Sequence, residues 1–241
     1  MYSNKIIGII GGNGVAATNK LCELVENRFT LAGAFRDMHH PEMIIWQATQ
    51  APSRSMYVEG RGPSYIDDYV SIARQLKTLG ASTICMCCNT AHYAIDEIQS
   101  KSEIPFINLI EEVVKKVATS GMQNVGIMAS DGCVQGKVYE KYFERICPNI
   151  NVIYPEEAFQ KEITRGICNI KNKNRFLDDN HLDRPKNIFT GVYNYLIDRG
   201  ADIVIAGCTD IRVDFKHENT IDSLEILADT IYNLIKNKDD K

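Results

Sequence analysis

The chain has 241 residues, of which 44% are hydrophobic and 24% are charged, and its formal net charge is −4. These values are typical of a folded globular protein and exclude a disordered or low-complexity chain. Because Lys and Arg form no block, we expect no nucleic acid and no membrane as a partner. The first apolar run is too short to span a membrane and is unlike a secretory signal, so we expect a cytoplasmic protein.

Short apolar runs alternate with amphipathic stretches along the first half of the chain. Strands are predicted over residues 5–10, 43–48, 82–87 and 105–109. Helices are predicted over residues 18–30, 65–79 and 91–99, with a loop over residues 50–62. Strands that alternate with helices indicate a mostly parallel sheet flanked by helices.

The second half shows the same alternation. Strands are predicted over residues 125–129, 151–154 and 202–206, with a short strand and a helix within 220–235. Helices are predicted over residues 156–170 and 188–198, and the polar segment 171–184 is predicted to be a loop.

The two halves repeat one another. Residues 80–88 (GASTICMCC) align with residues 200–208 (GADIVIAGC) at an offset of 120 residues. The opening strands align at an offset of 118 and the closing strand–helix units at 114. Three similar offsets in one order indicate an internal duplication.

The duplication predicts an α/β fold of two pseudo-symmetric lobes, with the active site in the cleft between them. Each lobe is expected to be a mostly parallel sheet flanked by helices. We assign residues 1–104 and 215–241 to the first lobe and residues 105–214 to the second.

Two of the eight cysteines, Cys88 and Cys208, stand at equivalent places in this repeat. Free thiols suit a long chain without an export signal better than disulfides do, and most of the other cysteines are expected to pack in the core. Each of the two follows a buried strand, and ligands of parallel sheets bind beyond the carboxyl ends of the strands. Facing lobes would bring both thiols to one ligand from opposite sides. A two-base racemase or epimerase needs this arrangement, since one thiolate removes the α-proton and the opposite thiol delivers another.

Two other motifs suggest different chemistry. Cys85, Cys87 and Cys88 with His92 could suggest a metal cluster, but a second ligand pair is missing, so no metal is expected. Residues 12–17 fit the dinucleotide fingerprint G-x-G-x-x-A, although no acidic residue ends the next strand. We interpret this glycine turn as a close backbone approach to a small ligand, and nucleotide binding remains the alternative.

Three segments together resemble the aspartate/glutamate racemase family. They are residues 7–14 with Gly-Gly-x-Gly, residues 88–92 (CNTAH) and residues 207–210 (GCTD). The resemblance covers nearly the whole chain in order. It implies a cofactor-independent isomerase with two pseudo-symmetric lobes, in which Cys88 and Cys208 are the catalytic pair.

The resemblance also implies the substrate contacts. Asn89, Thr90 and Thr209 are expected to hold the α-carboxylate and the amino group. Aspartate racemases use a loop arginine in a P-x-R-[ST] context for the distal carboxylate, and Arg54 matches it. A guanidinium can bind a carboxylate at two points. A second-lobe lysine is expected nearby, either Lys171 or Lys161. The remaining expected contacts are Gly12, Asn13, Ser130 and Asp210.

The predicted function is the interconversion of L- and D-aspartate, or glutamate, by a two-thiol proton transfer without a cofactor. The expected partners are a small amino-acid substrate and, from the resemblance, a second copy in a homodimer. Asn13, Cys87 and Asp210 depart from the Met, Pro and Glu usual in the family, which leaves the substrate open.

Other functions stay open. Within the superfamily they are a hydantoin racemase, a decarboxylase or a cis–trans isomerase of a dicarboxylate, although the decarboxylases use one cysteine. A different class is a non-catalytic protein that binds a small acid. Such a ligand would stabilise the protein without any proton exchange.

Overall fold

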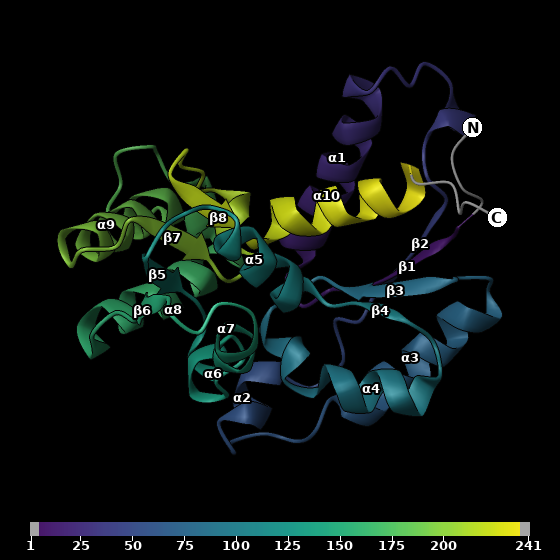
Figure 1. Ribbon diagram of the computed structural model, residues 1–241, viewed down its shortest axis with the longest axis horizontal. Coiled ribbons are helices and arrows are strands. Elements are labelled where there is room, and N and C mark those ends of the chain that lie inside the picture. Colours follow the sequence, from purple (N-terminus) through teal and green to yellow (C-terminus); the bar gives the residue numbers. More distant parts are fainter. Residues whose placement is uncertain (1–4, 237–241) are drawn as a thin grey trace.

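The computed structural model describes residues 5–236. It contains two parallel sheets of four strands each, related as the repeat predicts (Figure 1). The first sheet has the order β2-β1-β3-β4 and the second the order β6-β5-β7-β8. The strands of the first sheet are β1 (Ile7–Gly11), β2 (Met43–Gln47), β3 (Thr83–Met86) and β4 (Phe106–Ile107). Those of the second are β5 (Asn124–Met128), β6 (Asn151–Ile153), β7 (Ile203–Ala206) and β8 (Thr220–Asp222). The predicted fold class is confirmed.

Helices cover both faces of each sheet (Figure 1). In the first half of the chain they are α1 (Val15–Leu31), α2 (Arg54–Val58), α3 (Ile66–Thr78), α4 (Ile95–Ser102) and α5 (Leu109–Ala118). In the second half they are α6 (Asp131–Gln135), α7 (Glu140–Ile146), α8 (Glu157–Ile170), α9 (Pro185–Asp198) and α10 (Ser223–Lys236). Four 3-10 helices are η1 (Asp37–His39), η2 (Thr90–Ala94), η3 (Lys173–Phe176) and η4 (Ile211–Val213).

Three hydrophobic clusters form the core. One lies between α3, α4 and the first sheet, and another lies between α8, α9 and the second sheet. The largest cluster joins the lobes, because it contains side chains of both sheets and of α1, α5 and α10. The yellow helix α10 lies against α1 in Figure 1. The lobes therefore share one continuous core that fixes their strand ends relative to one another.

Equivalent glycines let a helix approach each central strand. A Cβ at Gly8 of β1 would lie 3.3 Å from Leu76 Cδ1 of α3. A Cβ at Gly126 of β5 would lie 3.2 Å from Leu196 Cβ of α9. The same close helix packing thus occurs in both lobes, in agreement with the duplication.

The structure corrects several predicted segments. The expected loop 50–62 contains α2, and the expected loop 171–184 contains η3. Helices α5, α6 and α7 were not predicted. Strand pairing places β4 on the first sheet and β8 on the second. The predicted lobe boundaries at 104/105 and 214/215 assign β4 to the second lobe and β8 to the first, opposite to this pairing, and the boundaries themselves stay a prediction. Within the described part of the chain, no helix is both long and apolar enough to cross a membrane.

Candidate active site

A cavity of about 180 Å³ lies where the carboxyl ends of the two sheets meet. Both candidate thiols line it, Cys88 two residues after β3 and Cys208 two residues after β7. Each follows the strand that pairs with the first strand of its own lobe. The cavity therefore exposes a small ligand to one thiol from each half of the repeat.

The two thiols are half-buried, whereas their neighbours Cys85 and Cys87 are fully buried in the core, as expected. Burial raises the pKa of the Cys208 thiol, and nearby Asp210 raises it further, while Lys171 lowers it. These contributions together favour the protonated form of the Cys208 thiol.

Arg54 and Asn13 form one wall of the cavity. The Arg54 guanidinium donates to the carbonyl of Pro52 at 3.0 Å and to the carbonyl of Asn13 at 3.4 Å. Burial opposes its charge, but Cys88 and Tyr69 beside it raise the pKa of Arg54. The hydroxyl of Tyr69 donates to Asn13 Oδ1. These contacts hold both side chains in place from the first lobe.

Lys171 and Asp210 form an ion pair on the opposite wall. Lys171 Nζ lies 3.1 Å from Asp210 Oδ2, and Asp210 is almost completely buried. Burial raises the pKa of Asp210, while Lys171 lowers it. A Cβ at Gly14 would lie 1.9 Å from Asp210 Oδ1, so the glycine turn is what lets this carboxylate pack against the first lobe.

Unpaired polar atoms concentrate around this cavity. Five buried side-chain polar atoms of the described residues have no hydrogen-bond partner, and three belong to residues that line the cavity. They are Asn13 Nδ2, Arg54 Nε and Asp210 Oδ1. Buried polar groups are normally paired, so two donors and one acceptor left without partners indicate a place for a polar ligand.

Hydroxyl groups line the remaining wall and join the lobes. Thr90 Oγ1 and Ser130 Oγ lie 2.7 Å apart across the cleft. Thr209 Oγ1 donates to the carbonyl of Cys87 at 3.2 Å. Ser55 Oγ accepts from the amide of Gly132 at 2.9 Å. These contacts tie the strand ends of one lobe to those of the other.

Two predicted contacts lie outside this cavity. Asn89 donates through Nδ2 to Ser223 Oγ at 3.0 Å, and its Oδ1 accepts from the Tyr139 hydroxyl at 2.7 Å. Both ends of its side chain are therefore occupied by contacts within the protein. Gly12 lines a neighbouring pocket instead. Of the two candidate lysines, Lys171 lines the cavity, and Lys161 pairs with Glu157 at 2.6 Å on the surface of α8.

His92 is a fully buried support for the Cys88 turn. Its Nδ1 lies 2.8 Å from the carbonyl of Cys88, and its Nε2 accepts from the amide of Leu109 at 3.2 Å. Since Nε2 accepts, Nδ1 carries the hydrogen and donates to Cys88. Burial lowers the pKa of His92 to about 4. The ring is neutral and orients the backbone of Cys88.

Sequence reasoning missed further residues that line the cavity: Ser53, Ser55, Asp131, Thr164, Ile167 and Cys168. Asp131 accepts from Gln160 Nε2 at 2.7 Å and from Thr164 Oγ1 at 2.8 Å. Ser55 belongs to the P-x-R-[ST] motif and Asp131 follows Ser130. Their position next to a predicted site residue in the sequence is the signal that could have found both. The α8 residues have no such signal.

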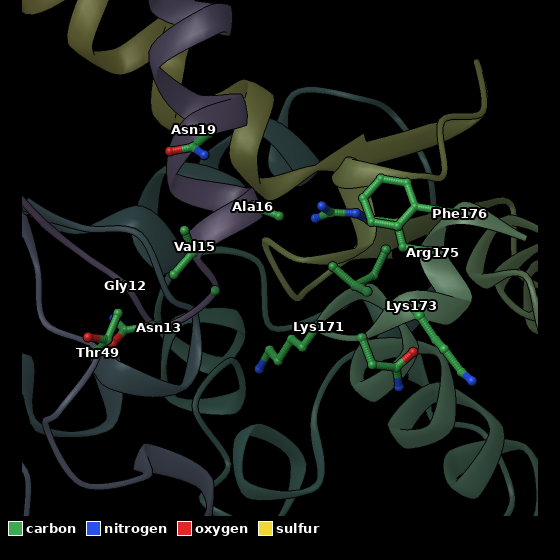
Figure 2. Close-up of a pocket in the computed structure, with 13 residues that line it drawn as sticks. Gly12, Asn13, Val15, Ala16, Asn19, Thr49, Lys171, Lys173, Arg175 and Phe176 are labelled. Atoms are coloured by element: carbon green, nitrogen blue, oxygen red, sulfur yellow. The ribbon is translucent and has the colours of Figure 1, made fainter.

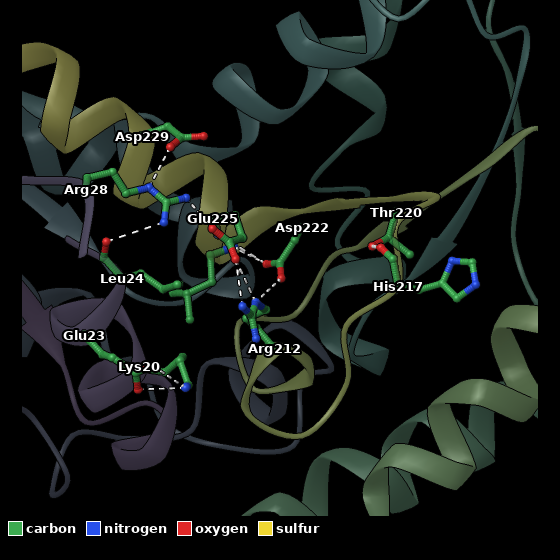
Figure 3. Close-up of polar contacts among 11 residues, drawn as sticks. Lys20, Glu23, Leu24, Arg28, Arg212, His217, Thr220, Asp222, Glu225 and Asp229 are labelled. Atoms are coloured by element: carbon green, nitrogen blue, oxygen red, sulfur yellow. Dashed lines mark hydrogen bonds and ion pairs between the residues drawn. The ribbon is translucent and has the colours of Figure 1, made fainter. Parts of the chain in front are cut away.

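A charged network supports the loop after Cys208 (Figure 3). Arg212 Nε lies 3.0 Å from Asp222 Oδ2, and Arg212 Nη2 donates to Glu225 Oε1 at 2.8 Å. Glu225 also pairs with Arg28 of α1, which binds Asp229 at 2.8 Å. Burial raises the pKa of Asp222 to about 6, although Arg212 lowers it. The network links η4, α10 and α1.

A second pocket of about 610 Å³ adjoins the cavity and shares Asn13 and Lys171 with it (Figure 2). We call it the outer pocket. Its other walls include Gly12, Val15, Arg175 and Phe176. Among residues 5–236, no group of three or more His, Cys, Asp or Glu side chains is arranged to hold a metal ion.

Comparison with known proteins gives the family. Residues 7–230 match the family described as Asp/Glu/Hydantoin racemase. The chain belongs to this family. It is 25% identical over 230 residues to the broad specificity amino-acid racemase RacX of Bacillus subtilis, covering 92% of this chain and 95% of that protein.

Solved racemases share the fold. The aspartate racemase of Picrophilus torridus superposes with a TM-score of 0.80 at 25% identity, over 95% of this chain and 93% of that one. A glutamate racemase of Francisella tularensis in complex with D-glutamate superposes with a TM-score of 0.60 at 20% identity, over 96% of this chain and 81% of that one. The predicted homodimer stays a prediction.

Proposed function

We propose that this protein racemises aspartate or glutamate by a two-thiol proton transfer that needs no pyridoxal phosphate. The observation that carries the proposal is the pair Cys88 and Cys208, which line one small cavity from equivalent places in the two lobes. Family membership and the amino-acid racemases among the relatives support the reaction class.

The unpaired atoms support a pose for the substrate. Arg54 and Asn13 offer buried donors without partners, which suit a carboxylate, and a guanidinium is the strongest such donor. Asp210 Oδ1 is a buried acceptor without a partner, which suits the substrate ammonium. Thr90 and Ser130 share one hydroxyl hydrogen between them, so their second hydroxyl hydrogen adds a weaker donor for the second carboxylate.

The chemical step is a balanced proton relay. One cysteine, as a thiolate, removes the α-proton, so that its S–H bond forms as the substrate C–H bond breaks. The opposite cysteine, as a thiol, donates its proton to the other face of the α-carbon and becomes a thiolate. The two roles exchange for the other enantiomer, and His92 holds the Cys88 backbone throughout.

A second candidate is racemisation of a wider set of amino acids. The cavity holds two cationic side chains, Arg54 and Lys171, and two acidic ones, Asp131 and Asp210. Because the charges balance, the net charge of the cavity does not by itself select an acidic amino acid. The broad-specificity relative supports this candidate.

A panel of L-amino acids tests both candidates by chiral separation of the product. Aspartate or glutamate should give the highest kcat/KM, and Arg54→Lys should raise KM for aspartate by about tenfold or more while changing alanine little, because a lysine cannot bind a carboxylate at two points. Cys88→Ser and Cys208→Ser should abolish turnover, and Cys147→Ser, outside the cavity, should not. Equal kcat/KM for acidic, neutral and basic substrates would favour the second candidate, and activity in either of the two thiol variants would refute the mechanism.

A further inference from the structure

The outer pocket is not used by the proposed racemisation. Its volume of about 610 Å³ exceeds three times that of the catalytic cavity. That size lies in the range of roughly 300–1,000 Å³ found for small-molecule sites. One wall comes from the glycine turn and the start of α1 in the first lobe, and the other comes from η3 and the end of α8 in the second. A ligand there would contact both lobes.

The pocket is cationic. Lys171, Lys173 and Arg175 line it, and none of its described lining residues is acidic. Lys171 is paired with Asp210, whereas Lys173 and Arg175 form no ion pair within residues 5–236. In Figure 2 the Arg175 guanidinium points toward Ala16 at the start of α1, while Lys173 points away. Arg175 therefore adds a positive charge opposite the helix end, where it also helps to lower the pKa of Asp210.

The start of α1 offers donors to the same space. Gly14 precedes this 17-residue helix and provides no side-chain cap, and its first turn contains no acidic residue. The Thr18 hydroxyl accepts from the amide of Gly12 and donates to the carbonyl of Gly14, both at 3.0 Å, so it closes the turn and leaves the helix end uncapped. The first amides of a helix have no partner within it, and they carry the positive end of the helix dipole.

A buried donor without a partner borders this pocket. Asn13 lines it, is only 7% exposed, and its Nδ2 has no partner among the described residues. A buried amide that lacks an acceptor costs free energy unless a ligand provides one. Asn13 lines both the outer pocket and the catalytic cavity, so an acceptor on a ligand in either space would satisfy this donor.

Exposed apolar side chains form the rim. Phe176 is 75% exposed and Val15 is 47% exposed. The Arg175 guanidinium carbon lies 4.5 Å from the centroid of the Phe176 ring. An exposed aromatic ring beside an arginine is a surface on which a flat heterocycle stacks.

We propose that the outer pocket binds a phosphorylated small molecule of mononucleotide size. Its phosphate lies between Arg175 and the first turn of α1, and its ring lies against Phe176. Phosphates bind at helix N-termini for the reasons given, and a guanidinium matches the phosphate oxygens. Asn13 and Lys171 border both spaces, so the ligand changes the apparent KM for substrate in the catalytic cavity. Where this change is one of substrate affinity, substrate changes the affinity of the ligand by the same factor.

Isothermal titration calorimetry of the full chain tests this binding without requiring racemase activity. The probes are AMP, ADP, adenosine, inorganic phosphate and L-aspartate. Arg175→Ala is the test variant. Arg36→Ala is its matched control, since Arg36 also lies over a neighbouring phenylalanine, at 5.4 Å from the Phe35 ring, but outside this pocket.

We expect AMP or ADP to bind one per chain, at least tenfold more weakly in Arg175→Ala and unchanged in Arg36→Ala. Phe176→Ala should weaken the nucleotide and leave inorganic phosphate unchanged. No binding of AMP or ADP at millimolar concentration would overturn the proposal, as would equal loss in both arginine variants. Binding of phosphate alone would also overturn it, and so would competition by L-aspartate for the same site, which would make the pocket a substrate entrance. Failure of the proposed racemase activity would leave these binding results intact.

Discussion

Replacing Arg212 by methionine should destabilise the protein by an amount that grows with pH. Methionine keeps a long, flexible apolar side chain but removes the charge that faces Asp222 and Glu225 (Figure 3). The Asp222 side chain is only 12% exposed, and its folded pKa of about 6 lies above its ordinary value of 3.8. Its contribution to stability is therefore fully present below pH 3.8 and is lost as the pH rises through 6.

The size of the effect follows from this shift. A shift of one pKa unit corresponds to about 1.4 kcal/mol, so a folded pKa near 6 already costs about 3 kcal/mol at neutral pH. Without Arg212 the pKa rises further and Asp222 stays protonated. The stability that Arg212→Met loses through Asp222 cannot exceed the free energy of protonating this carboxyl in the unchanged protein. That free energy is about 1.4 kcal/mol at pH 7 and about 2.7 kcal/mol at pH 8. The lost hydrogen bonds to Glu225 add about 1 kcal/mol at every pH.

Urea denaturation followed by circular dichroism at pH 5.5, 7 and 8 measures the difference. Arg212→Met should lose about 1 kcal/mol at pH 5.5 and about 3–4 kcal/mol at pH 8. Arg28→Met is the matched control, because Arg28 pairs with Glu225 and Asp229 and not with Asp222. Its loss should not vary over this range. In an Asp222→Asn background, Arg212→Met should lose its pH dependence. A loss that is constant from pH 5.5 to 8 would refute the reasoning.

Two other predictions concern the turns that hold the thiols. Gly14→Ala would place a Cβ 1.9 Å from Asp210 Oδ1, so it should lower the free energy of unfolding by about 1–3 kcal/mol and racemase activity at least tenfold. The control Gly191→Ala, in open space on α9, should raise the free energy of unfolding by about 0.5–1 kcal/mol. A Gly14→Ala variant with unchanged stability and activity would contradict the close approach. The Cε1–H resonance of His92, assigned with His92→Gln, should titrate near pH 4. Its depressed pKa means that about 3 kcal/mol of stability is present above pH 6.5 and is lost as the pH falls toward 4, so a midpoint near 6.5 would contradict its burial.

The repeat and the strand ends could be predicted from the sequence, and the side-chain contacts within the cleft could not. Apolar runs followed by cysteine at an offset of 120 residues placed Cys88 and Cys208 at equivalent strand ends, where the structure has them. Local pattern suffices there, because a buried parallel strand is a continuous apolar run.

Asn89 shows where the local pattern ends. It follows Cys88 directly and was expected to hold substrate, yet its amide binds Ser223 and Tyr139, which are 134 and 50 residues away. The α8 residues that line the cavity, such as Thr164 and Cys168, belong to a helix packed on the second sheet and meet Arg54 of the first sheet's half only in the folded protein. Such long-range packing has no signal in a local sequence window.

The short helix α2 was predicted as a loop for a physical reason. Its five residues are too few to show a helical period. The Ser53 side chain accepts from the amide of Met56 at 3.3 Å and begins the helix. This cap is the signal that could have located the helix and, with it, the position of Arg54.

The measurement that tests the two-thiol account most directly is α-proton exchange in D₂O with single-thiol variants. Each enantiomer of the best substrate is followed by NMR with Cys88→Ala and with Cys208→Ala. The account predicts that neither variant racemises, and that each exchanges the α-proton of one enantiomer only, opposite for the two variants, because one thiol serves each face. Racemisation by either variant, or exchange of the same enantiomer by both, would contradict it.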